Sequence, residues 1–533
     1  MSSAPTAARC LARALADRGV TLAFGMPGGV LLPVLDALRK EGIRFVLTRH
    51  ETAAAFMAEA VWRTTGAPGV ALGTLGPGAT QLLSGVAGAW LDRAPVVAIT
   101  GEIGTRNRTL YTHQILDQRA LFEPITHRSV TLTAQEAWRE IPLALRHLTA
   151  GRPGPVHLNL PGDVATAEQP GFWPDRFDPA PVAPLQAQLD EAIALVRAAR
   201  RPVIAVGCSD LSDQVDLTLY ALAHQLKAPV ITTYKAKGIL AETDTWSAGA
   251  FGLSPVVDRR QQALLAQADL LLAVGLDPVE LRPQWLPGWS RDLAVVAVDA
   301  TPPVDLVSPL ARTLVGEVPT LLQRLAVAGA STWEPLEIAR HRDALQRGFD
   351  DGPDGPAATI RALRRALPAD GVCTLDVGAH RITACHAWTC TRPRRLLQSN
   401  GFSTMGYGLP AAIGAALAQP QAKVMAITGD MGLWMYAGEL GTAAEQGLDL
   451  VVVYLSDRSL SLIELKQERL SLPSSGVRFE NPKVEALADA FGGVGVQVRG
   501  EEAVEAAARE ALEAGGVRLI EAVIDPAGYR RQM

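Results

Sequence analysis

The sequence predicts an α/β protein made of three consecutive domains, each with a parallel sheet. The chain has 533 residues, which is too long for a single core because domains usually hold ~100–200 residues. Short apolar runs alternate with Ala-rich helical patterns across Gly/Pro turns, and this alternation indicates βαβ units. The composition is 48% hydrophobic but only 5% aromatic, which suits helices that lie close to parallel strands.

The first predicted domain covers residues 1–170. Apolar positions at helical spacing predict a helix over 6–17, and a buried strand within GPVHLNLPGDV (154–164) closes the block. Between them, β-rich runs predict strands at Leu22–Phe24, Phe45–Thr48, Gly69–Leu72 and Val96–Ile99. Residues 165–187 are rich in Pro, Asp and Ala, which predicts a linker on the surface.

The second predicted domain covers 188–345, and the third covers 356–533. A stretch with weak helical or strand periodicity, which contains DDGPDGP, separates the two domains. Strands are expected in the second domain at Pro202–Val206, Pro229–Thr232, Leu270–Val274 and Leu293–Val298. In the third domain they are expected at Val372–Asp376, Val424–Thr428, Leu450–Leu455 and Leu519–Val523. The first and third blocks are similar in size, although no sequence repeat relates them.

Charge and cysteine content narrow the function classes. The net charge of -5 and the pI of about 6.0 give no electrostatic case for a nucleic-acid partner. The five cysteines are scattered, which fits a reducing compartment better than a disulfide framework. No secretory segment and no bilayer-spanning run is present, so we expect a cytoplasmic protein without a membrane partner. Cys385, His386 and Cys390 match no standard zinc spacing, and a structural metal there is not favoured.

Two aspartates follow consecutive strands of the third block. Asp430 lies in the turn Gly429-Asp430-Met431-Gly432, and Asp457 follows Ser456 at the end of the next strand. That edge of a parallel sheet is where open α/β folds bind ligands. A glycine-rich turn at a helix start suits a phosphate, and two carboxylates beside it suit a divalent cation. Taken singly, each aspartate is also explained as a turn or cap residue.

The segment from Gly429-Asp430 to Ser456-Asp457 resembles the metal-binding motif of thiamine diphosphate-dependent enzymes. Its aspartates are 27 positions apart, as in that family. The resemblance implies that Asp430, Asp457 and the carbonyl of Ser459 bind Mg²⁺. It also implies that the turn Gly429, Asp430, Met431 and Gly432, with Asp457, contacts the diphosphate. Met431 stands where the family usually has Gly, and Ser456-Asp457 replaces Asn-Asn.

Glu51 begins a helical pattern after the strand-like run Phe45–Thr48. On its own, a glutamate there is explained by the positive end of a helix. However, Thr48-Arg49-His50-Glu51, with residues 74–101 downstream, resembles the pyrimidine-binding domain of the same family. The resemblance implies that Glu51 bonds to the aminopyrimidine ring and favours the tautomer that removes a proton from the thiazolium carbon. The turn containing Pro27 and Gly28 resembles the one beside that ring.

Further segments carry the same resemblance. The turn from Asp376 to His380 resembles a diphosphate-contacting turn, with Gly378 and His380 as contacts. Met405 stands where the family has an apolar wedge under the cofactor, and Ser403 would offer its carbonyl; core filling is the other reading of Met405. The pattern Gly406-x-Gly408-x-x-Ala411 mimics a dinucleotide fingerprint, but it lacks the βαβ context and the acidic residue. Its glycines are expected to allow close helix packing.

His113 and Gln114 lie on an expected loop of the first block. A His-Gln pair here resembles the acetolactate synthase-like branch and carboxyethylarginine synthase, in which such side chains face the reacting carbon. A plain loop position for both residues stays open.

Within this family the cofactor lies between two subunits. The resemblance therefore implies a homodimer, or a homotetramer, in which Glu51 meets Asp430 of another copy. The expected activity is a carboligase that decarboxylates a small-molecule 2-oxo acid such as pyruvate and transfers the carbanion to a second carbonyl.

Three other activities remain open. The first is a simple 2-oxo acid decarboxylase, but Ile463 falls where such enzymes place a glutamate, with Glu464 one position away. The others are an FAD-binding protein, although 188–345 shows no clear FAD signature, and a non-catalytic member of the fold. Little sequence follows the last expected strand, which favours a specialised pathway over branched-chain amino-acid synthesis.

Overall fold

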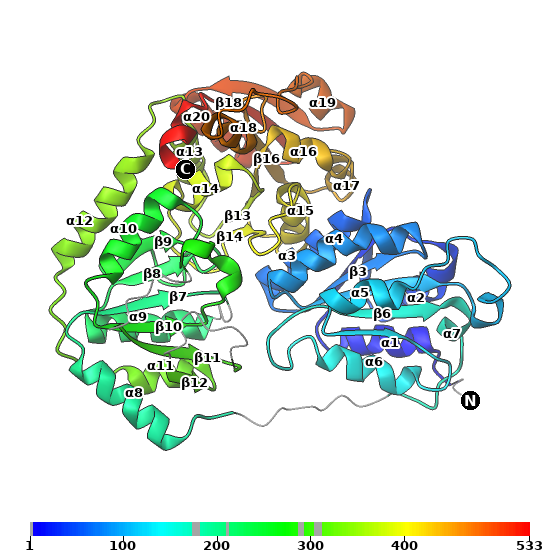
Figure 1. The fold of residues 1–533 in the computed structure, drawn as a ribbon. Coiled ribbons are helices and arrows are strands. Elements are labelled where there is room, and N and C mark those ends of the chain that lie inside the picture. The colour runs from blue at the N-terminus through cyan, green and yellow to red at the C-terminus, as the bar shows by residue number, and fades with distance from the viewer. Residues whose placement is uncertain (1–3, 173–181, 209–212, 286–292, 303–311) are drawn as a thin grey trace.

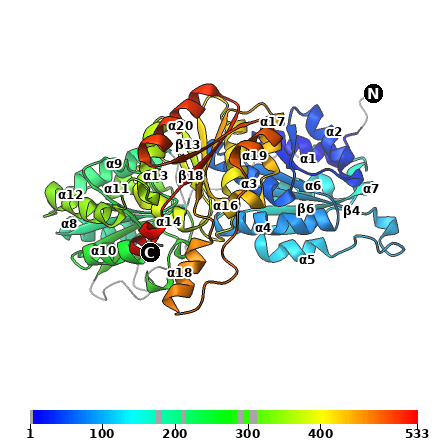
Figure 2. The same ribbon diagram turned by 90° about the horizontal axis from the view of Figure 1, so that it is seen from above.

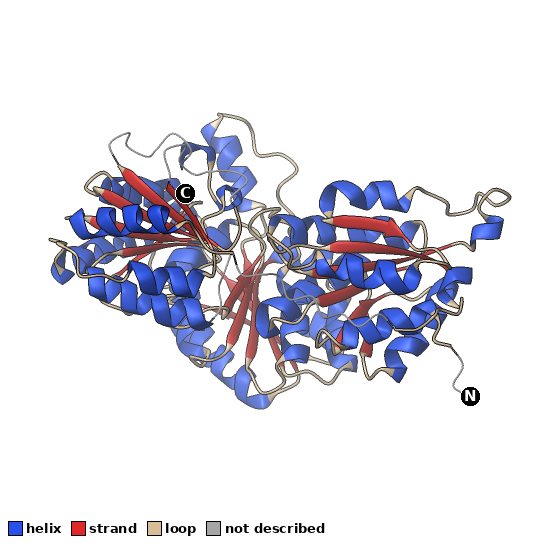
Figure 3. Ribbon diagram, turned by 90° about the horizontal axis from the view of Figure 1, so that it is seen from below, coloured by secondary structure: helices blue, strands red, loops and turns tan. Residues whose placement is uncertain are grey.

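The computed structural model describes residues 4–172, 182–208, 213–285, 293–302 and 312–533. It contains three six-stranded sheets whose strands pair in parallel, with helices on both faces of the sheets (Figures 1 and 3). This confirms the predicted fold class. The interior of the predicted linker, 173–181, lies outside the described residues.

The first sheet has the strand order β2-β1-β3-β4-β6-β5. Its strands are β1 (Leu22–Gly25), β2 (Arg44–Leu47), β3 (Gly69–Gly73), β4 (Val96–Glu102), β5 (Arg128–Thr131) and β6 (Val156–Pro161). Its helices are α1 (Ala7–Ala16), α2 (Leu32–Lys40), α3 (Glu51–Thr65), α4 (Pro77–Leu91), α5 (Gln118–Phe122), α6 (Ala137–Arg146) and α7 (Gly162–Ala165).

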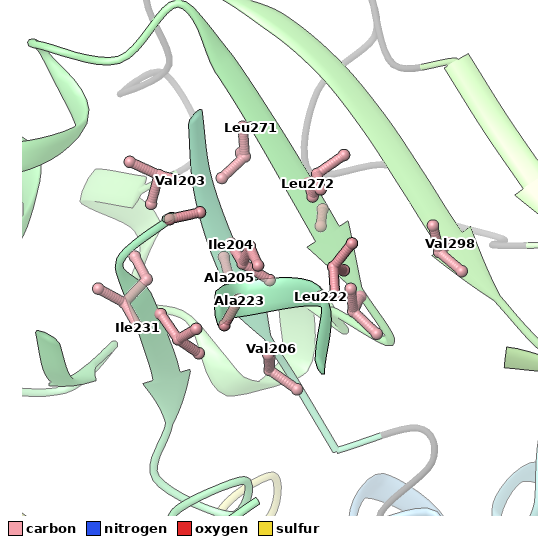
Figure 4. Close-up of a cluster of buried hydrophobic side chains, with 14 of the residues drawn as sticks. Val203, Ile204, Ala205, Val206, Leu222, Ala223, Ile231, Leu271, Leu272 and Val298 are labelled. Carbon is pink, nitrogen blue, oxygen red and sulfur yellow. The ribbon is translucent and has the colours of Figure 1, made fainter. Parts of the chain in front are cut away.

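The second sheet has the order β12-β11-β10-β7-β8-β9. Its strands are β7 (Pro202–Val206), β8 (Val230–Thr233), β9 (Ser247–Phe251), β10 (Leu270–Val274), β11 (Ala294–Asp299) and β12 (Arg312–Val315). Its helices are α8 (Gln186–Ala198), α9 (Asp213–Leu226), α10 (Pro255–Leu265), α11 (Val318–Leu325) and α12 (Pro335–Gln346). Figure 4 shows aliphatic side chains of β7 and β10 packed with Leu222 and Ala223 of α9.

The third sheet has the order β14-β13-β15-β16-β18-β17. Its strands are β13 (Val372–Leu375), β14 (Leu396–Gln398), β15 (Val424–Gly429), β16 (Leu450–Ser456), β17 (Val494–Arg499) and β18 (Val517–Val523). Its helices are α13 (Pro356–Ala366), α14 (Ala379–Ala387), α15 (Gly408–Ala418), α16 (Asp430–Met435), α17 (Glu439–Glu445), α18 (Ser461–Arg469), α19 (Val484–Ala490), α20 (Glu501–Ala514) and α21 (Ala527–Gln532).

The first and third sheets share one topology although their sequences show no repeat. Counted within each sheet, both have the order second, first, third, fourth, sixth, fifth strand. The strand order therefore reverses between β1 and β3 in one sheet and between β13 and β15 in the other. Such a reversal opens a crevice beyond the carboxyl ends of the two strands.

Small residues allow α3 of the first domain and α15 of the third to lie side by side (Figure 1). A Cβ on Gly414 would lie 2.4 Å from the backbone oxygen of Met57. The α3 face is built of fully buried alanines, including Ala54 and Ala58. This close packing of α3 against α15 joins two domains into one core.

Buried ion pairs also connect the domains. Lys235 of the central domain lies 3.0 Å from Asp92 and 3.5 Å from Glu59, both in the first domain. Asp92 in turn accepts hydrogen bonds from the backbone N–H groups of Asn400 (3.1 Å) and Gly401 (2.8 Å) in the third. All three domains therefore meet around one buried carboxylate.

Every strand expected from the sequence is present, and the described residues contain five further strands that were not predicted. The missed strands are β5, β9, β12, β14 and β17, and each is at the edge of its sheet. No helix in the described part of the chain is both long and apolar enough to cross a bilayer.

Candidate active site

A cavity of about 220 Å³ lies at the carboxyl ends of β13, β15 and β16, beside the reversal of strand order. The helices that follow these strands, α14, α16 and α18, are labelled in Figure 2, and each contributes residues to the cavity lining. Ten residues predicted to contact the cofactor or the metal line the cavity: Gly378, His380, Ser403, Met405, Gly429, Asp430, Met431, Gly432, Asp457 and Ser459. The fold thus brings together residues from four separate segments.

Asp430 begins α16 and is 3% exposed. Its Oδ1 accepts a hydrogen bond from the N–H of Met431 (3.0 Å), and its Oδ2 accepts from the N–H of Arg458 (2.9 Å) and from Asn481 Nδ2 (3.3 Å). Burial raises the pKa of this carboxyl above its ordinary value. A cation beside it would offset that cost of burying charge.

Asp457 follows β16 and faces the same cavity. Its Oδ1 accepts from the N–H of Ser459 at 3.2 Å, and its Oδ2 accepts from the hydroxyl of Ser461. Burial, with a contribution from the charge of Asp430, raises the pKa of Asp457 to about 6. A buried carboxyl whose ionisation is opposed by a neighbouring carboxylate suits a divalent cation.

The donor set expected from the sequence for such a cation is two carboxylates and a carbonyl. In the portion of the chain that the structure describes, no group of three or more His, Cys, Asp and Glu side chains is arranged to hold a metal. Magnesium keeps water molecules and takes few protein ligands, so the expected pair with the Ser459 carbonyl needs no third acidic residue.

Asp376 organises the cavity although it was not predicted as a site residue. It is fully buried at the end of β13, and it accepts hydrogen bonds from the N–H of Gly406 (2.8 Å) and from the hydroxyl of Thr428 (2.8 Å). It therefore ties the loop that carries Ser403 and Met405 to the ends of β13 and β15. Its place after a strand beside β15 was the signal that could have identified it.

Gly406 and Gly408 allow other residues to pack closely against the backbone, but these residues are not on a neighbouring packed helix. A Cβ on Gly406 would lie 2.3 Å from the ring of Tyr436, and one on Gly408 would lie 3.0 Å from the Cβ of Asp376. The expectation that these two glycines allow close packing between helices was therefore wrong: Gly406 packs against Tyr436 and Gly408 against Asp376. The helix contact falls on Gly414 instead.

His380 at the start of α14 presents a neutral ring to the cavity. Burial lowers its pKa to about 3, and its Nε2 has no hydrogen-bond partner among the described residues. The ring packs under the backbone of Gly378, where a Cβ would lie 2.7 Å from it. A buried ring nitrogen without a partner is costly, so the position favours a hydrogen bond with a ligand.

Glu51 is the first residue of α3 and is 5% exposed. Its Oε2 is buried without a hydrogen-bond partner in the described ranges, and burial raises its pKa. A Cβ on Gly78 of α4 would lie 3.1 Å from Oε1, so Gly78 leaves room for the carboxyl. A buried carboxyl with a raised pKa and an oxygen that lacks a partner suits a hydrogen bond to a ring nitrogen.

The turn that contains Pro27 and Gly28 follows β1 at the other reversal of strand order. A Cβ on Gly28 would lie 1.9 Å from the hydroxyl of Thr74, which follows β3. The two turns are therefore in direct contact at the end of the first sheet. Neither Glu51 nor this turn lines the 220 Å³ cavity, so within one chain the expected pyrimidine half-site lies outside the expected diphosphate half-site.

His113 and Gln114 lie on an exposed segment between β4 and α5. The oxygen of Gln114 would be 2.8 Å from a Cβ on Gly76, so this residue sits at the start of α4. Neither side chain lines the cavity of the third domain. Leu110, Tyr111 and Leu116 on the same segment are exposed by 84%, 51% and 45%.

Ile463 and Glu464 of α18 point to different surroundings. Ile463 lines the cavity. Glu464 accepts hydrogen bonds from Ser459 Oγ (2.6 Å), Ser474 Oγ (2.8 Å) and Arg478 Nε (2.9 Å), and it does not line the cavity. The position that faces the cavity is therefore apolar.

Other residues that line the cavity were missed, among them Leu460, Leu462 and Tyr529. Tyr529 lies on α21 and is fully buried. No pattern near Tyr529 indicated a site, because its role comes from the packing of the last helix.

Cys385, His386 and Cys390 are buried and have separate surroundings. Cys385 donates to Gln398 Oε1 at 3.3 Å, and His386 Nε2 lies 2.7 Å from the Tyr234 hydroxyl. The five cysteines are all free.

Comparison with known proteins gives three family matches along the chain. Residues 5–121 match the N-terminal TPP binding domain of thiamine pyrophosphate enzymes, 189–325 match their central domain, and 376–522 match their C-terminal TPP binding domain. The relatives include acetolactate synthase isozyme 3 large subunit of Escherichia coli, which is 30% identical over 95% of this chain and 92% of its own. Acetolactate synthase of Bacillus subtilis is 30% identical over 96% and 92%, respectively, and acetolactate synthase large subunit of Corynebacterium glutamicum is 31% identical over 96% and 86%.

Proposed function

The chain belongs to the thiamine pyrophosphate enzymes, in the acetolactate synthase-like branch, and on that premise we propose that it is a carboligase acting on 2-oxo acids. It would decarboxylate one 2-oxo acid, such as pyruvate, and join the remaining carbon unit to a second carbonyl. The observation that carries this is the single cavity that gathers ten expected cofactor and metal residues at the reversal of strand order.

The residues present fit thiamine diphosphate and Mg²⁺. Two buried polar atoms, Glu51 Oε2 and His380 Nε2, lack hydrogen-bond partners among the described residues. Burial also raises the pKa values of Asp430 and Asp457. A ring nitrogen, a diphosphate and a divalent cation would satisfy these groups.

The proposed roles follow from position. Asp430, Asp457 and the Ser459 carbonyl would hold Mg²⁺, while Gly378, His380 and the turn Gly429–Gly432 would hold the diphosphate. Ser403 and Met405 would contact the cofactor between its rings, and Pro27, Gly28 and Glu51 would hold the pyrimidine. When bound, thiamine diphosphate supplies an electron sink for the decarboxylation.

Side chains of the protein would orient the reactants, and one of them would share a proton with the pyrimidine nitrogen. Glu51, with its raised pKa, would keep a hydrogen bond to the pyrimidine nitrogen in a site from which water is excluded. Met405, Met431, Leu460 and Ile463 give the cavity an apolar wall. His113 and Gln114 would reach the substrates from the first domain.

A second copy of the chain is part of the proposal. The two half-sites do not share a cavity within one chain, and exposed apolar side chains flank both of them. Leu110, Tyr111 and Leu116 are on the same segment as His113. Ile463 lines the third-domain cavity, Phe402 precedes Ser403, and Met435 ends α16. A homodimer, alone or within a homotetramer, would cover these side chains and complete the site.

We also propose domain limits of 1–170, 188–345 and 356–533, and a cytoplasmic location, which fits the five free, buried cysteines. The proposal does not require FAD. The central sheet reverses its strand order between β7 and β10, but a Cβ on Gly207 there would lie 2.4 Å from the oxygen of Gly275. A yellow purified protein would revive the FAD hypothesis.

Simple decarboxylation is the competing activity. Ile463 rather than an acidic residue lines the cavity, and Glu464 is held by Ser459, Ser474 and Arg478. A protonating carboxyl is therefore missing at this wall, which favours carboligation.

The test is a panel of 2-oxo acids incubated with the protein, thiamine diphosphate and Mg²⁺, with products identified by mass. The proposal expects a product that joins two substrate carbon skeletons with loss of CO₂. Acetaldehyde as the sole product from pyruvate would rule out the carboligase. Failure to bind thiamine diphosphate in calorimetry would instead support a non-catalytic member of the fold.

A further inference from the structure

Asn481 contacts Asp430 from a stretch between α18 and α19 that has no regular secondary structure. It is half-buried and does not line the cavity. Asn481 therefore contacts an expected metal ligand, Asp430, from outside the cavity that Asp430 lines.

The orientation of the Asn481 amide is fixed by Trp434. An indole N–H only donates, and Trp434 Nε1 lies 3.0 Å from Asn481 Oδ1, so Oδ1 must accept. The amide nitrogen then points the other way, with Ser456 Oγ at 2.9 Å and Asp430 Oδ2 at 3.3 Å. Reversing the amide would place two donors against each other at Trp434.

Ser456 is fixed in the same way. Its hydroxyl donates to Glu521 Oε1 at 2.8 Å, and the other carboxylate oxygen of Glu521 accepts from Gln497 Nε2 at 2.8 Å. Because the Ser456 proton is committed to Glu521, its oxygen accepts from Asn481. Both amide protons of Asn481 are therefore used, one on Asp430 and one on the residue that precedes Asp457.

We propose that Asn481 is a positioning residue that sets the affinity for the divalent cation. It holds Asp430 directly and holds the start of the Asp457 segment through Ser456, so it fixes the two carboxylates relative to each other. With the N–H of Arg458, it commits Asp430 Oδ2 to a single direction. Groups that orient metal ligands in this way contribute to metal affinity although they never touch the metal. The inference rests on the proposed function.

The test measures the Kd for Mg²⁺ at a fixed, saturating thiamine diphosphate concentration, by calorimetry, in wild type, Asn481→Ala and Trp434→Phe. We expect the Kd to rise about 10–100-fold in Asn481→Ala. It should rise by a smaller factor in Trp434→Phe, which keeps the amide but loses its orienting donor. Excess Mg²⁺ should restore wild-type cofactor stoichiometry, because the cavity itself is unchanged.

Glu480→Ala is the matched control. Glu480 precedes Asn481 in the chain, and its side chain is 85% exposed and pairs with Arg458 at 3.0 Å. The Glu480→Ala variant should therefore keep the wild-type Kd for Mg²⁺. An unchanged Mg²⁺ Kd in Asn481→Ala overturns the inference. A loss of cofactor binding that excess Mg²⁺ does not restore also overturns it. If Asn481→Ala fails to fold, an unchanged Kd in Trp434→Phe overturns it. If the wild type binds no thiamine diphosphate with Mg²⁺, the proposed function is what fails.

Discussion

The carboxylate of Asp376 accepts a hydrogen bond from the backbone N–H of Gly406 at 2.8 Å. This contact joins the end of β13 to the loop that presents Ser403 and Met405 to the cavity. The same carboxylate lies so close to α16 that a Cβ on Gly432 would be 2.2 Å from its Oδ2 and 2.8 Å from Thr428 Oγ1. Asp376, which does not itself line the cavity, therefore packs directly against Gly432, which does.

Gly432→Ala should destabilise the protein. The added methyl group has no space against Asp376 and Thr428, and overpacking of this kind costs about 1–3 kcal/mol. Urea unfolding would measure the loss. Gly348→Ala is the control, since a Cβ there meets nothing within 4 Å. Equal free energies of unfolding for the two variants would show that Gly432 is not tightly packed against Asp376 and Thr428.

The contribution of Asp457 to the stability of the cofactor-free protein should fall as pH rises from about 4 to about 6, because burial raises the pKa of Asp457 from 3.8 to about 6. Within that interval the folded carboxyl holds a proton that the unfolded one has lost, so raising the pH favours unfolding. The stability of Asp457→Asn relative to wild type should therefore increase by on the order of 1–3 kcal/mol over this pH interval. Urea unfolding at several pH values without Mg²⁺ would measure it. Parallel curves for both proteins would contradict the assigned shift.

Glu51→Gln should lower kcat at least about 100-fold, the contribution expected of a proton-handling carboxyl. Stability should not fall, because burial already disfavours the ionised carboxyl. Steady-state rates and thermal unfolding would be measured together. Glu123→Gln, whose side chain is 60% exposed, is the control in the same domain. A variant with normal kcat would remove Glu51 from the mechanism.

Ile463→Glu should shift the products of pyruvate turnover toward acetaldehyde. The new carboxyl would face the cavity and could protonate the carbon unit before a second carbonyl reaches it. Product mass analysis would give the ratio, with Ile463→Leu as an apolar control that keeps the wild-type ratio. An unchanged ratio in Ile463→Glu would mean that this wall does not decide the outcome.

The central strands could be predicted from the sequence, whereas most edge strands could not. Strands such as Pro202–Val206 and Leu270–Val274 are buried on both faces, so they read as continuous apolar runs. Val494–Arg499 of β17 is largely exposed on both faces and shows no such run. Pairing with β18 rather than local hydrophobicity makes it a strand.

The site was predictable where it lies on strand ends. Asp430 and Asp457 follow central strands, and parallel strands present their carboxyl ends at one edge. Asn481 and Tyr529 could not be found in this way, because tertiary packing alone brings them to the site. The remaining gap concerns His113, which a single chain leaves exposed and away from the cavity.

The central claim is that Glu51 of one copy and Asp430 of another complete one site. Hybrid dimers of Glu51→Gln and Asp430→Ala, carrying different tags and purified through both, test it with 2-oxo acid turnover. Each parent should be inactive, whereas the hybrid contains one site with both residues intact and should recover about half of the wild-type activity. A hybrid as inactive as its parents would contradict the claim, because Glu51 and Asp430 would then have to act within the same chain.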